Sequence, residues 1–158
     1  MAGNFTKADA QLRPDPKYNS KQLSRFINCI MRDGKKAVAQ RVVYQALEAI
    51  EERTKGNPAP MEVFEKAIEN VKPHVEVRSK RVGGANYQVP MQVNRKRQMS
   101  LAFRWIIDSA RSEKGKPMHL RLAKELMDAA KGEGKAMGVR DQTHRMADAN
   151  KAFAHFAW

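Results

Sequence analysis

Apolar residues recur along most of this chain at the spacing of helices that bury one face. The first stripe follows Ser20, a residue that can cap a helix, and consists of Leu23, Phe26, Ile27, Ile30 and Met31. Gly34 suits the end of that helix. A second helix is predicted from about Lys35 until the segment KGNPAP interrupts it, and its stripe consists of Ala39, Val43, Ala46, Leu47 and Ile50.

Further helices are predicted downstream. The third starts around Pro60 and ends before Pro73, with an apolar face of Phe64, Ala67, Ile68 and Val71. Asn94 can cap the fourth, QMSLAFRWIIDSAR, which is apolar on most sides and is expected to be the central buried helix. The fifth follows Pro117 and carries Leu122, Ala123, Leu126, Met127 and Ala130. A sixth is predicted toward the C-terminus on the seam Met146, Ala149, Phe153 and Phe156.

Between the third and fourth helices the pattern changes to alternation. Residues 75–91 read VEVRSKRVGGANYQVPM, in which Gly83 and Gly84 tolerate the positive φ values of a tight hairpin turn. A lone two-stranded hairpin is only marginally stable in water, so its base should lean on the helices while its tip projects. The predicted fold is therefore mainly α: a six-helix bundle with one protruding two-stranded β-hairpin between the third and fourth helices.

Length and charge limit the function. At 158 residues the chain suits one domain, residues 1–158, with residues 1–19 expected as an extended N-terminal arm. Lys and Arg number 30 against 17 Asp and Glu, a formal net charge of +13. So large an excess repels itself in a compact monomer and attracts polyanions. Nucleic acid is the leading partner, an anionic membrane surface the second, and a merely basic soluble protein the remaining alternative.

The cations gather at predicted helix starts. The residues that follow the Asn94 cap are Arg95, Lys96 and Arg97. Unpaired N–H groups already make a helix start positive, so exposed cations there are unfavourable by about 0.3–1 kcal/mol each, and a phosphate reverses the sign. The same arrangement recurs at the second and fifth helices, through Lys35, Lys36 and Lys116. Three such starts on one chain favour recognition of backbone phosphates.

The hairpin carries cations as well, because Arg78, Lys80 and Arg81 lie on its first strand. They would be carried outward on a projecting arm. We prefer an arm that contacts RNA or DNA to a solvated loop with ordinary lysines, since basic residues recur on both sides of the ribbon.

No pattern indicates catalysis. The histidines lack the i, i+4 or cysteine-paired spacings of metal sites; they are His74, His119, His144 and His155. A ribonuclease with a histidine as general base is an alternative that no spacing favours. The chain is therefore expected to be no enzyme and to use neither cofactor nor metal.

The compartment follows from what the sequence contains. Cys29 has no second cysteine to pair with, and its setting in RFINCIM predicts a buried thiol. No run has the apolar length of a signal peptide or a membrane span, so a cytoplasmic protein without membrane contact is expected.

Five stretches carry a resemblance to a known family. They are PDPKYNS, RFINCIMRDGKKAVAQRVVYQALE, VEVRSKRVGGANYQVP, FRWIIDSAR and HRMADANKAFAHFAW. In this order and spacing, from about Pro14 to Trp158, the chain resembles the bacterial small-subunit ribosomal protein S-seven family. That resemblance implies a helical bundle with an extended hairpin, which agrees with the fold predicted above.

The resemblance also implies a function: a structural constituent of the small ribosomal subunit that binds the 3′ major domain of its ribosomal RNA and nucleates assembly of the head. It implies a hairpin near the exit-site tRNA and the mRNA path, and contacts with ribosomal proteins S-nine and S-eleven. With the helix-start residue Lys116 added to those that the resemblance implies, the residues expected to bind ribosomal RNA are Lys35, Lys36, Arg78, Arg95, Lys96, Arg97, Lys116 and Met118. Those implied on the arm toward tRNA and mRNA are Lys80, Arg81, Gly83, Gly84 and Tyr87. From charge alone, the alternative is a DNA-architectural or generic polyanion-binding protein.

Overall fold

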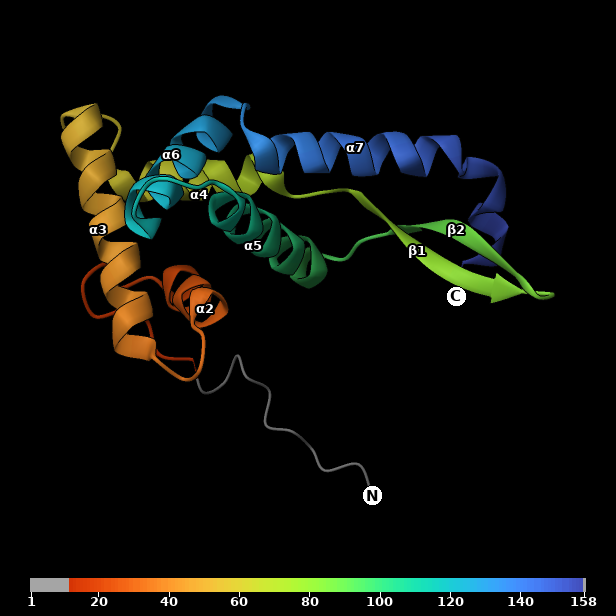
Figure 1. Ribbon diagram of the computed structural model, residues 1–158, viewed down its shortest axis with the longest axis horizontal. Coiled ribbons are helices and arrows are strands. Elements are labelled where there is room, and N and C mark those ends of the chain that lie inside the picture. The colour runs from red at the N-terminus through yellow and green to blue at the C-terminus, as the bar shows by residue number, and fades with distance from the viewer. Residues whose placement is uncertain (1–11, 158) are drawn as a thin grey trace, which may run out of the picture.

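The computed structural model describes residues 12–157, and helices dominate them (Figure 1). In chain order the elements are α2 (Lys21–Ile30), α3 (Lys36–Thr54), α4 (Pro60–Val71), β1 (Val75–Val82), β2 (Ala85–Gln92), α5 (Arg95–Ser112), α6 (Met118–Lys131), α7 (Lys135–Ala149) and the 3₁₀ helix η1 (Lys151–Phe156). The prediction of six α-helices with one hairpin between the third and fourth is confirmed within this part of the chain.

The predicted stripes form one core. Phe26 of α2 packs edge-to-face against Phe64 of α4 and Phe103 of α5, with ring centroids 5.2 and 5.3 Å apart. All three rings are fully buried. Helix α5 contacts α2, α4, α6 and α7. Helix α6 likewise contacts α3, α4, α5 and α7, so α5 shares the centre of the bundle with α6 instead of being the single central helix that its all-round apolar sequence predicts.

Most helix starts follow their sequence signals. The Ser20 hydroxyl accepts a hydrogen bond from the Leu23 N–H at 3.2 Å, and the Asn94 side chain accepts one from the Arg97 N–H at 2.9 Å. Pro60 occupies the first turn of α4. Each residue satisfies or removes a donor that a helix start leaves unpaired.

Two predictions around α2 are wrong. The helix ends at Ile30 rather than at Gly34, which lies in the turn before α3 with φ +69°. Cys29 is exposed rather than buried, because it lies on the side of α2 away from the core residues Phe26 and Ile30. An apolar-looking neighbourhood in sequence does not decide which side of a helix a residue occupies.

The hairpin pairs in one continuous antiparallel register, from Val75 opposite Gln92 to Val82 opposite Ala85. Gly83 and Gly84 form the two-residue turn with φ of +57° and +87°. Two successive positive φ values suit glycine, and they match the twist of the strands that the turn joins.

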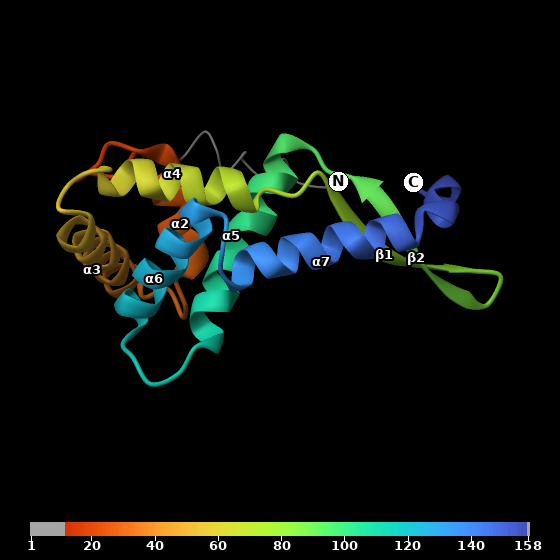
Figure 2. The same cartoon turned by 90° about the horizontal axis from the view of Figure 1, so that it is seen from above.

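The molecule consists of a helical body at one end and an extended part at the other (Figures 1 and 2). Helices α2 to α6 gather at one end, while the hairpin and α7 extend away from them side by side. The predicted sixth helix is partly wrong, because α7 ends at Ala149 and the chain turns into η1. Met146 is exposed, so the expected seam does not continue along one helix.

Of the predicted N-terminal arm, residues 1–11 lie outside the described part of the chain. Residues 14–19 form a turn around Asp15, whose side chain is buried. Asp15 accepts hydrogen bonds from the Lys17 and Tyr18 N–H groups at 3.0 and 3.1 Å and from the Tyr44 hydroxyl at 2.6 Å. The turn is thereby fastened to α3.

Candidate nucleic-acid interface

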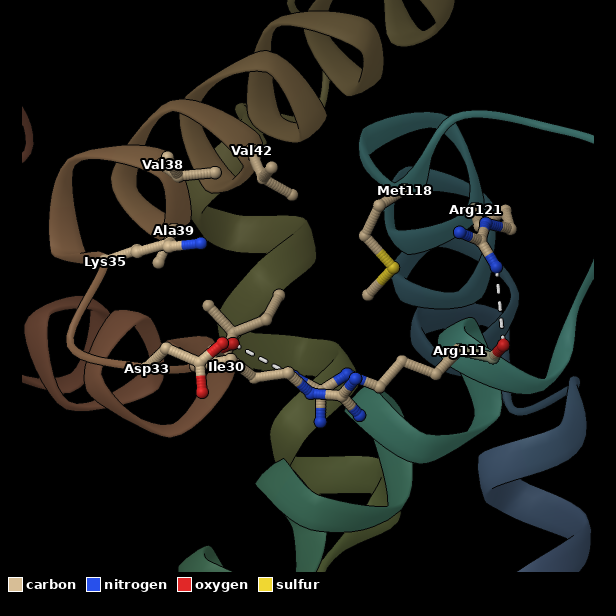
Figure 3. Close-up of a pocket in the computed structure, with 10 residues that line it drawn as sticks. Ile30, Asp33, Lys35, Val38, Ala39, Val42, Arg111, Met118 and Arg121 are labelled. Atoms are coloured by element: carbon tan, nitrogen blue, oxygen red, sulfur yellow. Dashed lines mark hydrogen bonds between the residues drawn. The ribbon is translucent and has the colours of Figure 1, made fainter.

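A cavity of about 290 Å³ opens where the end of α2, the start of α3, the end of α5 and the start of α6 converge (Figure 3). Two of the residues expected to bind RNA, Lys35 and Met118, line it together. Its other charged lining residues are Arg32, Asp33, Arg111 and Arg121. Four cations therefore surround one carboxylate, and the balance favours an anionic ligand.

Two of the arginines of this cavity, Arg111 and Arg121, are held in place by backbone carbonyls. Arg111 Nη2 donates to the Ile30 carbonyl at 2.9 Å, and Arg121 Nη1 donates to the carbonyls of Arg111 and Glu113. Partial burial and then the nearby charge of Arg32 lower the pKa of the Arg111 guanidinium. The Arg121 Nε–H is buried and finds no hydrogen-bond partner within residues 12–157. Fixed, close-set cations lose little freedom when an anion binds.

A row of arginines leads from this cavity along α5. Arg97, Arg104 and Arg111 are spaced by seven residues, so they lie on one side of the helix. The row spans about 21 Å at the helical rise of about 1.5 Å per residue. A groove of about 380 Å³ beside it is lined by both Arg104 and Arg111. The row therefore connects the cavity with the base of the hairpin.

At that base, Arg97 has a structural partner. Its Nε and Nη2 donate to Glu76 Oε2 at 3.2 and 3.0 Å, and Arg78 Nη2 lies 2.8 Å from Glu76 Oε1. Glu76 is 8% exposed. Arg95 and Lys96 are exposed at the same helix start. The predicted trio thus contains one arginine that holds a buried carboxylate, next to two cations whose side chains are exposed.

The other predicted residues divide similarly. Lys35 lines the cavity, whereas Lys36 lines a separate hollow with Arg13 and Asn28. Lys116 is exposed in the turn before α6. Met118 packs partly against the core, and its side chain extends into the cavity in Figure 3.

On the hairpin, the residues predicted to face a ligand have unequal surroundings. Lys80 Nζ donates to the Phe156 carbonyl at 2.8 Å, and the Tyr87 ring packs against Phe153 and Phe156. Arg81 is exposed one pair further out, opposite Asn86. Arg81 is therefore the cation at the tip, while Lys80 and Tyr87 also serve internal contacts.

Sequence reasoning missed Arg32, Arg104, Arg111 and Arg121. The seven-residue spacing from Arg97 to Arg111 could have revealed two of them. Arg32 and Arg121 join the site only because α2 and α6 meet the end of α5. Residues so far apart in the sequence show no local pattern from which their meeting could be predicted.

Residues 12–157 contain neither a cluster of metal ligands nor a membrane-spanning helix. There, no three His, Cys, Asp or Glu side chains are grouped to hold a metal ion. Nor does any helix of that part of the chain combine the length and apolar character needed to cross a membrane.

A rigid helical body with a fixed row of cations and a projecting ribbon has the features of a nucleic-acid-binding scaffold protein. The family model described as "Ribosomal protein S7p/S5e" matches residues 3–151. The chain therefore belongs to the ribosomal protein S7p/S5e family, whose members are structural constituents of the small ribosomal subunit and form no enzyme class.

Its relatives agree closely. The chain is 61% identical over 156 residues to the "Small ribosomal subunit protein uS7" of Rhodopirellula baltica, covering 99% of both chains. It is 55% identical over 156 residues to the protein of that name from Salinibacter ruber, again covering 99% of both. The match to that of Chromobacterium violaceum is 58% over 146 residues and 92% of both chains.

Proposed function

We propose that this chain binds the 3′ major domain of small-subunit ribosomal RNA and nucleates assembly of the head of the subunit in the cytoplasm. Membership of the ribosomal protein S7p/S5e family supports the RNA as the partner. The observation that carries the proposal is the arginine row on α5, which joins the cavity at Lys35 and Met118 to the cations at the base of the hairpin.

The geometry supports recognition of RNA shape. Phosphate contacts fix the register of a protein on a nucleic acid, and folded RNA is recognised mainly through its shape and backbone. Arg32 follows α2, Lys35 precedes α3, Arg111 lies on α5 and Arg121 on α6. The backbone positions of these cations are fixed because the four helices share one core. Such a surface fits one folded RNA junction better than a flexible polyanion.

The hairpin arm, Val75–Gln92, is proposed to contact RNA at a second place, away from the α5 row. We assign it to the neighbourhood of the exit-site tRNA and the mRNA path, with Arg81 as its outermost cation. Ribosomal proteins S-nine and S-eleven are the proposed protein neighbours. The chain's resemblance to the S-seven family supports these finer assignments.

Binding to a head-domain ribosomal RNA fragment over a salt series tests the proposal. We expect the double variant Arg95→Gln/Lys96→Gln to bind several-fold more weakly, with a log–log salt slope shallower by up to about one unit per lost phosphate contact. The matched control Lys55→Gln/Lys66→Gln removes the same charge from exposed positions, with Lys55 at the far end of α3 from Lys36. The control should keep the slope.

Duplex DNA and an unrelated RNA serve as competitors in the same titration. The proposed function requires the fragment to be preferred over both. Equal competition by all three would overturn it and leave a DNA-architectural or generic polyanion-binding protein.

A further inference from the structure

The hairpin arm does not project alone, because η1 packs on it. Helix η1 contacts β2 and α7, and none of its residues is buried. In Figure 2 it lies beside the hairpin at the far end of α7. Its packing is therefore directed at the arm rather than at the core of α2 to α6.

Helix η1 contacts both strands of the hairpin at the same residue pair, Lys80 and Tyr87. Tyr87 of β2 packs against the rings of Phe153 and Phe156, with centroids 5.1 and 5.2 Å away. Lys80 of β1 pairs with Tyr87 in the register, and its Nζ donates to the Phe156 carbonyl at 2.8 Å. This pair is the third from the turn, so the contacts act on the outer half of the arm.

The chain is turned toward the arm by Asn150. Its side chain donates to the Met146 carbonyl at 2.8 Å, at the end of α7, and its carbonyl accepts from the Phe153 N–H at 2.9 Å. The first contact ends the helix and the second starts η1. A continuous α-helix would carry Phe153 and Phe156 onward along the axis of α7 instead.

We propose that the segment Lys151–Phe156 is a brace that positions the hairpin arm for its RNA contacts, with Phe153 and Phe156 as the positioning residues. An isolated two-stranded hairpin is marginally stable in water, so the order of its outer half must come from packing. Helix α7 contacts β1 and β2, and the brace adds aromatic packing nearer the tip. The RNA role of the arm rests on the proposed function, whereas the brace itself is a property of the free protein.

Amide hydrogen exchange in the full chain tests the brace. In the variant Phe153→Ala/Phe156→Ala, we expect the amides of Lys80–Val82 and Ala85–Tyr87 to exchange about tenfold faster or more, while those of α5 keep their rates. Phe153→Leu/Phe156→Leu retains apolar bulk and should recover much of the protection. Met146→Ala, at an exposed position on α7, should change nothing.

Two results would overturn the brace. Unchanged exchange in the arm would mean that the aromatic packing does not order it. Faster exchange in α5 to the same degree would make Lys151–Phe156 part of the global fold instead of a brace of the arm. If the alanine variant does not fold, the same comparison of the arm with α5 is made in the leucine variant.

Two further measurements test the RNA contacts: affinity for the head-domain RNA fragment and tRNA binding in the exit site. The alanine variant should keep its affinity for the head-domain RNA fragment, because Phe153 and Phe156 lie away from the α5 row. Small subunits reconstituted with it should bind deacylated tRNA in the exit site several-fold more weakly. A loosened arm with unchanged tRNA binding would contradict the proposed role of the arm while the brace stands.

Discussion

Glu76 gives two nearby arginines, Arg97 and Arg78, a structural role. Its nearly buried carboxylate is held by Arg97 and Arg78. Removing one partner of a buried charge leaves the other incompletely satisfied, whereas an exposed cation at a helix start adds a small repulsion. Arg97 and Arg95, two residues apart, should therefore respond in opposite directions to the same substitution.

We expect Arg97→Gln to lower the free energy of unfolding by about 1–3 kcal/mol. Arg95→Gln should leave it unchanged or raise it by up to about 1 kcal/mol. Denaturant titration of the RNA-free variants measures both. Equal free energies of unfolding for the two variants would show that Arg78 alone satisfies Glu76.

A second buried carboxylate predicts a pH dependence. Glu125 of α6 accepts a hydrogen bond from the Ala136 N–H at 2.7 Å and so caps the start of α7. Burial, opposed by this hydrogen bond, raises the pKa of Glu125 above its ordinary value of 4.5. The folded state then binds more protons than the unfolded state above pH 4.5, so stability from this group falls as the pH rises through its raised pKa.

The variant Glu125→Gln keeps an oxygen that can accept from Ala136 but carries no charge. We expect its melting temperature to exceed that of the parent at pH 7, and the difference to vanish below about pH 4.5. Glu65→Gln, at an exposed position in the middle of α4, is the control and should show no such trend. A less stable Glu125→Gln at pH 7 would mean that the charged cap outweighs its burial cost.

Among the elements, those with strict periodicity could be predicted from sequence. The stripes of α2 to α6 repeat every three or four residues, and most of their members are buried as that spacing requires, while Met31, Met127 and Ala130 are partly buried. The end of α7 at Ala149 could not be predicted, because Phe153 and Phe156 also fit the apolar spacing of a helix that continues to the C-terminus. Their true partner, Tyr87, is distant in sequence, and only the folded chain brings it near.

The site divides in the same way. Helix starts fix Lys35, Arg95 and Lys96 from local signals alone. Glu76 alternates with valines as a solvent-facing residue would, so its capture of Arg97 across 21 positions was invisible. Local rules predict which residues begin an element, whereas ion pairs between elements depend on how the elements meet.

The hairpin can be shortened without touching its brace. Deleting Arg81, Val82, Ala85 and Asn86 keeps the Gly83-Gly84 turn and the pairing of Lys80 with Tyr87. Removing two residues from each strand preserves the alternation of faces. We expect unchanged helical content by circular dichroism, unchanged affinity for the RNA fragment and weaker exit-site tRNA binding in reconstituted subunits. Loss of helical content would show that the tip supports the fold.

For the whole molecule, charge opposes folding in the absence of RNA. A net charge of +13 is carried on a body held together by one core. Salt screens this repulsion, and it also weakens surface ion pairs such as Lys17–Glu48 and Lys124–Glu113. Exposed pairs of that kind contribute about 0–1 kcal/mol each, so relief of the general repulsion should be the larger effect.

The melting temperature of the free protein should therefore rise with sodium chloride, by roughly 2–4 °C for each kcal/mol of repulsion relieved. The variant Lys66→Gln/Lys114→Gln/Arg145→Gln lowers the net charge from +13 to +10 at exposed positions outside the α5 row. It should melt higher than the parent at low salt and respond less to added salt, because less repulsion remains to be screened. Thermal melts of both proteins at several salt concentrations measure this difference. A melting temperature that fell with salt would instead show that the ion pairs outweigh the repulsion, and that the excess of lysine and arginine costs the free protein little.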